Sequence, residues 1–253
     1  MAQGRPRRKS VARPAKRRIC NRHYRTGKVK DGLRHPQQGL SGLLPASIMG
    51  FGLRARKRMG GKEISVAIRK ALGCKSVVLI GLMGAGKTAI GRRLAKRLNL
   101  DFTDADGEIE QAAGQSITDI FSEHGEAYFR DGEQRVIARL LNDGPQVLAT
   151  GGGAYMSEET RGNIASQGIS VWLKAELDVL LERTGRRDNR PLLKAGDPGA
   201  VLERLIEERY PVYANADITV QSRDVAHEVI VDEILTALNQ NMVSAKNGKR
   251  RRS

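Results

Sequence analysis

The sequence of 253 residues contains no run of about 18 apolar residues, the length that a helix needs to cross a bilayer. The segment from Gly39 to Gly52 is mildly apolar, but Pro45 and several glycines interrupt it. The N-terminus also lacks the ordered charged, apolar and small-residue regions of a secretory signal. We therefore expect neither a membrane span nor secretion.

Cysteine is scarce, with only Cys20 and Cys74 in the whole chain. Two cysteines at this spacing form neither the disulfide framework of a small secreted domain nor a metal-binding motif. Because such frameworks belong to oxidising compartments, we expect a reducing, cytoplasmic setting.

Acidic residues are nearly absent from the first quarter of the chain. Residues 1–58 hold 17 lysines and arginines but a single acid, Asp31, whereas the other 195 residues hold 27 bases and 27 acids. The formal charge of +16 therefore belongs to this leader. A segment that repels itself and buries little apolar surface is expected to be disordered. We expect one domain over 59–242 and a second basic, disordered tail over 243–253.

Three interpretations of the leader stay open. It is a basic arm that touches nucleic acid or another anionic surface, or a transit peptide, which it resembles in being basic and poor in acids although serine is scarce. In the third interpretation, which we favour, translation begins at Met49 or Met59, and the leader is not part of the working protein.

From about Glu63 onward, short apolar segments alternate with helical patterns. We expect strands at 76–80, 100–103, 146–150, 169–173 and 217–220. We expect helices at 63–72, 88–98, 126–142, 176–183, 198–210 and 225–238, with Ser116 and Ser157 as capping residues. This alternation predicts an α/β fold with a parallel sheet covered on both faces. Ligands then bind beyond the carboxyl ends of the strands.

The most distinctive motif is Gly81-Leu82-Met83-Gly84-Ala85-Gly86-Lys87-Thr88, between an expected strand and an expected helix. In this order, the backbone N–H groups of the loop cradle a phosphate. Lys87 then reaches the outer phosphates, and the Thr88 hydroxyl holds Mg²⁺. A lysine at a helix N-terminus costs about 0.3–1 kcal/mol unless an anion is nearby, which argues against a chance match.

Two further strand ends carry distinctive residues. Asp104 and Asp106 follow the second expected strand, where they either cap a helix or serve Mg²⁺ and an acceptor hydroxyl. Gly151-Gly152-Gly153 follows the third and is either a plain flexible turn or a loop that lets backbone approach a ligand closely.

Several arginines are candidates for anion binding. Arg130 either pairs with Glu126 and Glu133 on a helix surface, which spacing alone favours, or offers a planar fork to an acidic substrate. Arg190 lies in an arginine-dense loop that suits a mobile cover over phosphate or is simply a solvated basic loop. Arg209 ends a helix, where the dipole favours a cation in any case.

Residues 74–240 resemble shikimate kinase, a small member of the nucleoside monophosphate kinase-like branch of phosphate-loop proteins. The resemblance rests on the phosphate loop and on an ordered series of segments: Asp104-Ala105-Asp106, Gly114-Gln115-Ser116-Ile117, Phe129-Arg130-Asp131-Gly132-Glu133, Gly151-Gly152-Gly153-Ala154, Arg190-Pro191-Leu192-Leu193 and Arg209-Tyr210-Pro211-Val212-Tyr213. It implies a three-layer P-loop kinase fold with a central parallel five-stranded sheet and a lid. The implied reaction is ATP-dependent phosphorylation of the shikimate 3-hydroxyl, on the route to chorismate and the aromatic amino acids.

The resemblance also implies a set of site residues. The residues implied in ATP binding are Gly84, Ala85, Gly86, Lys87, Thr88, Ala89 and Arg190. Those implied in shikimate binding are Asp106, Arg130, Gly151, Gly152, Gly153 and Arg209. Those implied in catalysis are Lys87, Asp106 and Arg190. Thr88 is the implied direct ligand of Mg²⁺, and Asp104 acts through water.

Two features depart from the family pattern. The leader has no counterpart in it, and the loop near Gln221 to Ala226, on the side where adenine would bind, has a less distinctive sequence. Arg183 and Arg223 are therefore weak candidates for contacts with the nucleotide base. Two alternatives stay open: a related kinase of another hydroxylated acid, such as gluconate, and a basic nucleic-acid-binding NTPase. We expect a monomer that binds ATP and shikimate rather than nucleic acid or a membrane.

Overall fold

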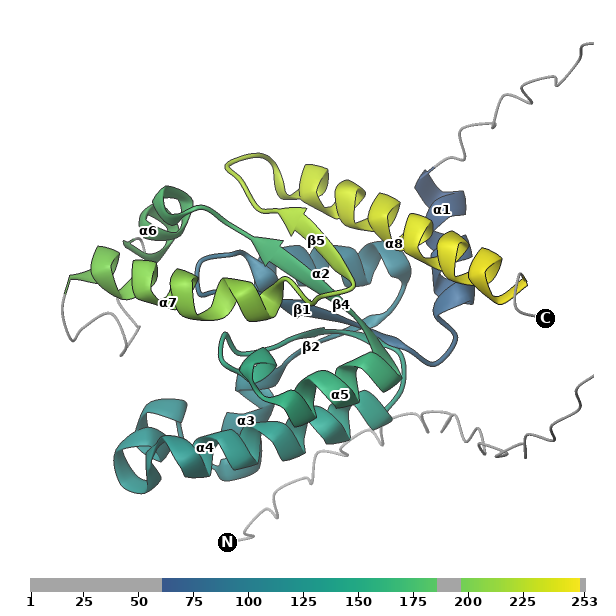
Figure 1. Ribbon diagram of the computed structural model, residues 1–253. Coiled ribbons are helices and arrows are strands. Elements are labelled where there is room, and N and C mark those ends of the chain that lie inside the picture. The colour runs from purple at the N-terminus through teal and green to yellow at the C-terminus, as the bar shows by residue number, and fades with distance from the viewer. Residues whose placement is uncertain (1–60, 186–196, 251–253) are drawn as a thin grey trace, which may run out of the picture.

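The computed structural model describes residues 61–185 and 197–250, and five strands in these ranges form one parallel sheet (Figure 1). The order is β2-β3-β1-β4-β5. The strands are β1 (Ser76–Ile80), β2 (Asp101–Asp104), β3 (Gln146–Ala149), β4 (Gly168–Lys174) and β5 (Ile218–Gln221). All four pairings are parallel. The five expected strands and their parallel arrangement are confirmed, with ends that shift by one residue at most.

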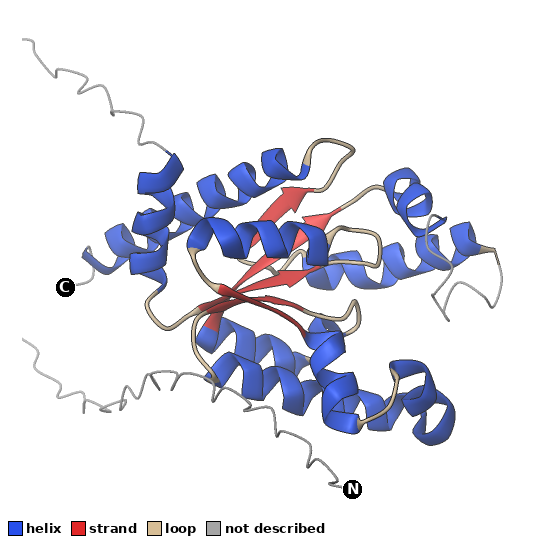
Figure 2. Ribbon diagram, turned by 180° about the vertical axis from the view of Figure 1, so that it is seen from behind, coloured by secondary structure: helices blue, strands red, loops and turns tan. Residues whose placement is uncertain are grey.

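Helices cover both faces of the sheet, which gives three layers (Figures 1 and 2). One face carries α2 (Lys87–Leu98) and α8 (His227–Arg250), against which α1 (Gly61–Leu72) packs. The other carries α5 (Glu158–Gln167) and α4 (Ile117–Asn142), with α3 (Ala105–Ala113) against α4. The remaining helices are α6 (Leu177–Gly185), α7 (Pro198–Tyr213) and the short 3₁₀ turn η1 (Ala154–Met156).

The central strands are buried along their whole length because helices cover both faces. Every residue of β1 and β3 is buried, whereas the edge strand β2 is half-exposed. Strands covered on both faces are continuous apolar runs, which is why residues 77–80 of β1 and 147–149 of β3 contain no polar residue that would mark an outer face.

A second, smaller apolar cluster lies outside the main core. Ile109 of α3 packs there with Ile120 and Phe129 of α4. Gly125 kinks α4 between these two residues, with φ of 80°. The kink lets one helix place its first turns over α3 and its later turns beside the sheet.

Several expected elements differ in detail. Both capping serines are confirmed, since Ser116 accepts from the Asp119 N–H at 3.1 Å and Ser157 from the Thr160 N–H at 3.2 Å. We did not expect α3 or η1.

The disordered tail expected over 243–253 needs correction, because α8 continues to Arg250. Leu238 and Met242 are buried and anchor the helix, and adding turns to a formed helix costs little. In the described ranges, no helix is both long enough and apolar enough to span a membrane.

Candidate active site

The loop after β1 has the backbone conformation of a phosphate cradle. Gly81, Gly84 and Gly86 have φ of 144°, 82° and 90°, values that side chains strongly disfavour. A Cβ on Gly81 would also lie 2.8 Å from the carbonyl oxygen of Leu173. Helix α2 begins directly after Gly86, so its free N–H groups and its positive dipole end face the loop. This is an anion-binding arrangement.

The side chain of Lys87 folds back over this loop. Its Nζ donates to the carbonyl oxygens of Gly81 at 2.8 Å and Leu82 at 3.0 Å. The ammonium group is thereby held half-buried against the loop.

Thr88 and Asp104 connect this loop to the end of β2. The Thr88 hydroxyl donates to Asp104 Oδ2 at 2.9 Å. Mg²⁺ in nucleotide sites takes hard oxygen ligands from one or two side chains and completes its shell with phosphates and water. The two oxygens therefore fit Mg²⁺. The described residues contain no cluster of three acidic, histidine or cysteine side chains that could hold a metal ion.

Asp106 lies in the first turn of α3, two residues beyond the end of β2. Its carboxyl is open to solvent on one side, yet enough protein surrounds it that desolvation raises its pKa above 3.8. The neighbouring Asp104 raises the pKa further, while Lys87 and Arg130 oppose the change. A carboxyl group with a raised pKa is a candidate to orient a hydroxyl group and accept its proton.

Each glycine of the loop after β3 faces a different side chain of the candidate site. A Cβ on Gly151 would lie 2.6 Å from Glu133 Oε1 and 3.0 Å from Asp106 Oδ1. One on Gly152 would lie 3.3 Å from Arg209 Nη1, and one on Gly153 would overlap the guanidinium of Arg130.

A side chain at Gly151 or Gly153 would require Glu133 or Arg130 to shift, because real Cβ atoms essentially never come so near to other heavy atoms. The structure brings Asp106, Arg130 and Arg209 together around one loop.

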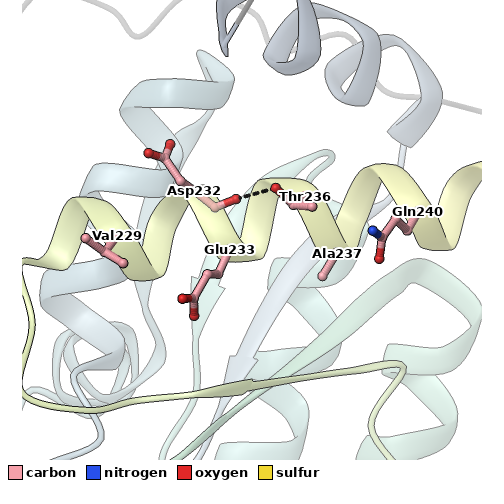
Figure 3. Close-up of a pocket in the computed structure, with 6 residues that line it drawn as sticks. All are labelled: Val229, Asp232, Glu233, Thr236, Ala237 and Gln240. Carbon is pink, nitrogen blue, oxygen red and sulfur yellow. Dashed lines mark hydrogen bonds between the residues drawn. The ribbon is translucent and has the colours of Figure 1, made fainter. Parts of the chain in front are cut away.

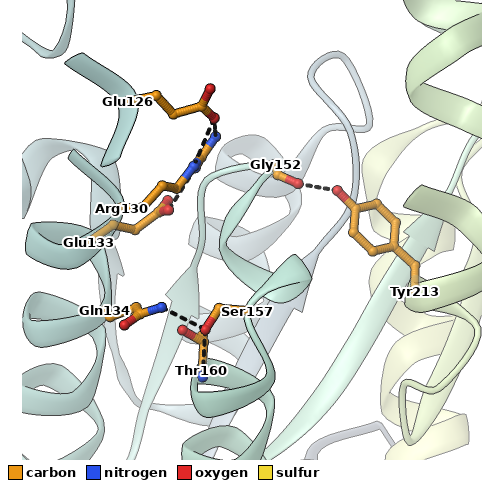
Figure 4. Close-up of polar contacts among 8 residues, drawn as sticks. All are labelled: Glu126, Arg130, Glu133, Gln134, Gly152, Ser157, Thr160 and Tyr213. Carbon is orange, nitrogen blue, oxygen red and sulfur yellow. Dashed lines mark hydrogen bonds and ion pairs between the residues drawn. The ribbon is translucent and has the colours of Figure 1, made fainter. Parts of the chain in front are cut away.

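Arg130 is held by two carboxylates, as its spacing predicts, but only one of the pairs lies on the surface. Its guanidinium contacts Glu126 at 3.0 Å and Glu133 at 2.7 Å (Figure 4). Burial raises the pKa of Glu133, which is 2% exposed, while the charge of Arg130 lowers it. Sequence reasoning missed Glu133 as a site residue, although its position three residues after Arg130 was the available signal.

Two buried polar atoms in this region have no hydrogen-bond partner within the described part of the chain. They are Glu133 Oε1 and Arg209 Nε. Leaving such atoms unpaired costs roughly 1–3 kcal/mol each. Their presence is typical of a site whose ligand or ordered water supplies the missing bonds.

Comparisons with known proteins agree with this geometry. A model of the family "Shikimate kinase" matches residues 83–239. A shikimate kinase of Rhodopseudomonas palustris is 61% identical over 175 residues, which are 69% of this chain and 86% of that protein. One of Bradyrhizobium diazoefficiens is 57% identical over 175 residues, 69% of this chain and 84% of that protein. The chain belongs to the shikimate kinase family.

Solved structures of the shikimate kinase family share the fold. The shikimate kinase of Acinetobacter baumannii in complex with shikimate aligns with a TM-score of 0.65 and 38% identity, over 68% of this chain and 98% of that one. The enzyme of Bacteroides thetaiotaomicron aligns with a TM-score of 0.62 and 28% identity, over 65% and 98%. The expected P-loop kinase fold is therefore confirmed.

The remaining candidate arginines have different surroundings. Arg190 lies outside the described residues. Arg183 donates to the Ser222 hydroxyl at 2.9 Å and to the carbonyl oxygens of Arg223 at 2.7 Å and Gly84 at 3.4 Å, so it braces the phosphate loop against the segment after β5. The Arg223 side chain forms an ion pair with Glu233, at 2.5 Å.

A shallow hollow of about 400 Å³ lies along α8 (Figure 3). Its two acids, Asp232 and Glu233, already pair with Arg97 and Arg223. Its lining residues in the described ranges all belong to α8 and include none of the shikimate kinase motifs.

Substitution of Gly153 tests the close approach of this loop to Arg130. We expect Gly153→Ala to weaken shikimate binding about 10- to 100-fold, because the new methyl group must displace the guanidinium. Calorimetric titration with shikimate and with ATP measures the effect, and ATP binding is expected to stay within twofold. Gly132→Ala is the matched control, since its methyl group meets open space two residues from Arg130. Equal affinities for shikimate in the two variants would contradict the assignment.

Proposed function

We propose that this chain transfers the γ-phosphoryl group of ATP to the 3-hydroxyl of shikimate, giving shikimate 3-phosphate and ADP on the route to chorismate and the aromatic amino acids. The observation that carries the proposal is the junction of two loops. A Cβ on Gly152 would lie 3.6 Å from the Gly81 carbonyl oxygen, so the loop that faces Arg130 and Arg209 lies beside the phosphate cradle. A small carboxylic acid held there has its hydroxyls beside the nucleotide.

The proposed nucleotide site is the loop and the first turn of α2. The backbone of Gly84, Ala85 and Gly86 and the first residues of α2 (Lys87, Thr88 and Ala89) bind the phosphates. Lys87 neutralises charge on the outer phosphates, for which it exchanges its contacts with the loop carbonyls. We also assign Arg190 to ATP, a role taken from the motif alone.

The proposed acceptor site is built from Arg130, Arg209 and the three-glycine loop. Two guanidinium groups grip the carboxylate of the substrate, since a planar fork supplies paired hydrogen bonds as well as charge. Glu126 and Glu133 hold Arg130 in place before the substrate arrives, which reduces the entropy lost on binding. Asp106 contacts the hydroxyl groups.

Transfer itself depends mainly on positioning and on electrostatic stabilisation. Asp106 orients the 3-hydroxyl toward the phosphate cradle and takes its proton. Lys87 and Arg190 stabilise the charge on the transferring group. Mg²⁺, held by Thr88 directly and by Asp104 through water, would neutralise charge on the phosphate oxygens when bound. We further propose that the enzyme acts as a monomer in the cytoplasm.

The raised pKa of Asp106 leads to a pH prediction. A general base must be ionised, so kcat is expected to fall as the pH drops through the pKa of Asp106, beginning at a higher pH than for an ordinary aspartate. Asp106→Asn is expected to lower kcat about 10²- to 10⁴-fold and to remove this limb of the pH–kcat profile.

Unfolding measurements control for damage to the fold. Because the pKa is higher in the folded than in the unfolded chain, ionisation of Asp106 opposes folding above that pKa. The Asp106→Asn variant should then be no less stable than the parent at neutral pH. Retention of the acid limb in the variant would exclude Asp106 as the base.

The acceptor is tested by a coupled ADP-release assay with shikimate, quinate and gluconate side by side. We expect turnover with shikimate to exceed turnover with the other two acids by at least about tenfold in kcat/KM, because the paired arginines and Asp106 are matched to one acid. Product analysis should locate the phosphate on the 3-hydroxyl. An enzyme that prefers gluconate, or that hydrolyses ATP without phosphorylating any of the three, would refute the proposal.

Deletion of residues 1–58 separates the kinase from a nucleic-acid-binding NTPase. We expect the shortened chain to keep kcat and both KM values within twofold, because the remaining 195 residues carry the whole family match and no net charge. Nucleic-acid binding by the full chain, if any, should disappear with the leader and weaken steeply with salt. Loss of shikimate turnover on deletion would show that the leader belongs to the enzyme.

A further inference from the structure

Tyr213 ends α7 directly beneath the three-glycine loop. Its side chain is fully buried and is among the largest such side chains in the described ranges. The hydroxyl donates to the carbonyl oxygen of Gly152, a contact between positions 61 residues apart (Figure 4). Burial raises the pKa of Tyr213, although Arg209 opposes the change, so the hydroxyl keeps its proton at neutral pH and acts as a donor.

The ring of Tyr213 cannot move easily, because three aromatic rings surround it. Trp172 lies edge-on at 5.9 Å, Tyr155 at 6.3 Å and Tyr210 at 6.2 Å between ring centroids. The hydroxyl is therefore presented to the loop from a rigid base. A hydrogen bond from so fixed a donor constrains the orientation of the peptide group that accepts it.

The constrained peptide group joins Gly152 to Gly153. The described chain has no cis peptide bonds, and in a trans peptide the C=O and the N–H point to opposite sides. Holding the Gly152 carbonyl toward α7 therefore turns the Gly153 N–H away from Tyr213, to the side of the loop where Arg130 lies (Figure 4). The neighbouring Ala154 N–H is bonded to the Gly151 carbonyl oxygen, whereas the Gly153 N–H has no backbone acceptor among the described residues.

We propose that Tyr213 is a positioning residue for the acceptor: by holding the Gly152 carbonyl, it aims the Gly153 N–H at the carboxylate gripped by Arg130 and Arg209. This inference rests on the function proposed above. Without the Tyr213 hydroxyl, the peptide group between Gly152 and Gly153 is free to rotate, because glycine accepts many backbone conformations. Tyr213 acts through the loop and through Arg209, whose side chain bonds to its hydroxyl, and is not itself placed against the nucleotide or the acceptor.

The test compares two tyrosines that differ in what their hydroxyls hold. Tyr213→Phe removes the bond to Gly152 together with the contact between the hydroxyl and the Arg209 side chain. Tyr210→Phe removes a similar bond, from the same helix to the carbonyl of Ala175, which directly follows β4. Both variants keep the ring and lose one tyrosine-to-backbone hydrogen bond. A comparable drop in melting temperature in each shows that the structural losses are matched.

We expect Tyr213→Phe to raise the KM for shikimate about five- to tenfold, which corresponds to the loss of one well-directed hydrogen bond. The kcat and the KM for ATP should stay within twofold of the parent values. Tyr210→Phe should leave all three constants within twofold. Equilibrium titration of shikimate, followed through the fluorescence of Trp172, the chain's single tryptophan, should repeat the pattern without turnover.

Each outcome decides the matter. An unchanged KM for shikimate in Tyr213→Phe overturns the inference. An equal rise in the KM for shikimate in Tyr210→Phe also overturns it, as does an equal rise in the KM for ATP in Tyr213→Phe. Either result indicates a general loss of rigidity rather than a specific effect on the orientation of the Gly153 N–H. If the parent enzyme phosphorylates shikimate and only the Tyr213 result fails, the proposed function stands. If the parent does not phosphorylate shikimate, the proposed function fails with the inference.

Discussion

The candidate site depends on the close contact between the loop after β1 and the loop after β3. β1 and β3 are neighbours in the sheet, so their carboxyl ends meet at one edge, and the first carries Gly81 while the second carries Gly152. Gly81 and Gly152 themselves carry no side chain that could separate the two loops at this point. Phosphoryl transfer needs donor and acceptor oxygens within a few ångströms and roughly in line. An added methyl group in the second loop would occupy the space that this geometry requires.

Charge in the acceptor region is balanced rather than uniformly positive. Burial raises the pKa values of Glu133 and Asp106. Arg130 opposes the rise at both acids, Arg209 opposes it at Glu133, and Lys87 opposes it at Asp106. A buried cation without a partner is costly, so Glu133 makes it possible to keep Arg130 ready before a substrate arrives. Only one oxygen of Glu133 is used for this purpose. The region is thus prepared for an anion that also offers polar hydrogens.

Much of this fold is predictable from local pattern, since each strand is a short apolar run and the phosphate loop sits between a strand and a helix. Asp106, Arg130 and Arg209 are individually ambiguous in sequence, and resemblance to a family was needed to group them. Helix α3 escaped prediction because its nine residues bury only Ala105 and Ile109, too few for a clear helical period. The contact between Tyr213 and Gly152 was out of reach for a different reason, since it joins α7 to a loop 61 residues earlier.

The three-glycine loop must be held in a single conformation by the segments around it. Successive glycines lose more conformational freedom on folding than any other residues, so the segment opposes its own structure. η1 restrains its end, because the Ala154 N–H bonds to Gly151 at 3.2 Å and the Met156 N–H to Gly153 at 3.0 Å. Those bonds do not restrain the carbonyl group of Gly152, which instead accepts a hydrogen bond from Tyr213 of α7. Rigidity around the acceptor is therefore supplied by η1 and α7, while the glycines supply the space.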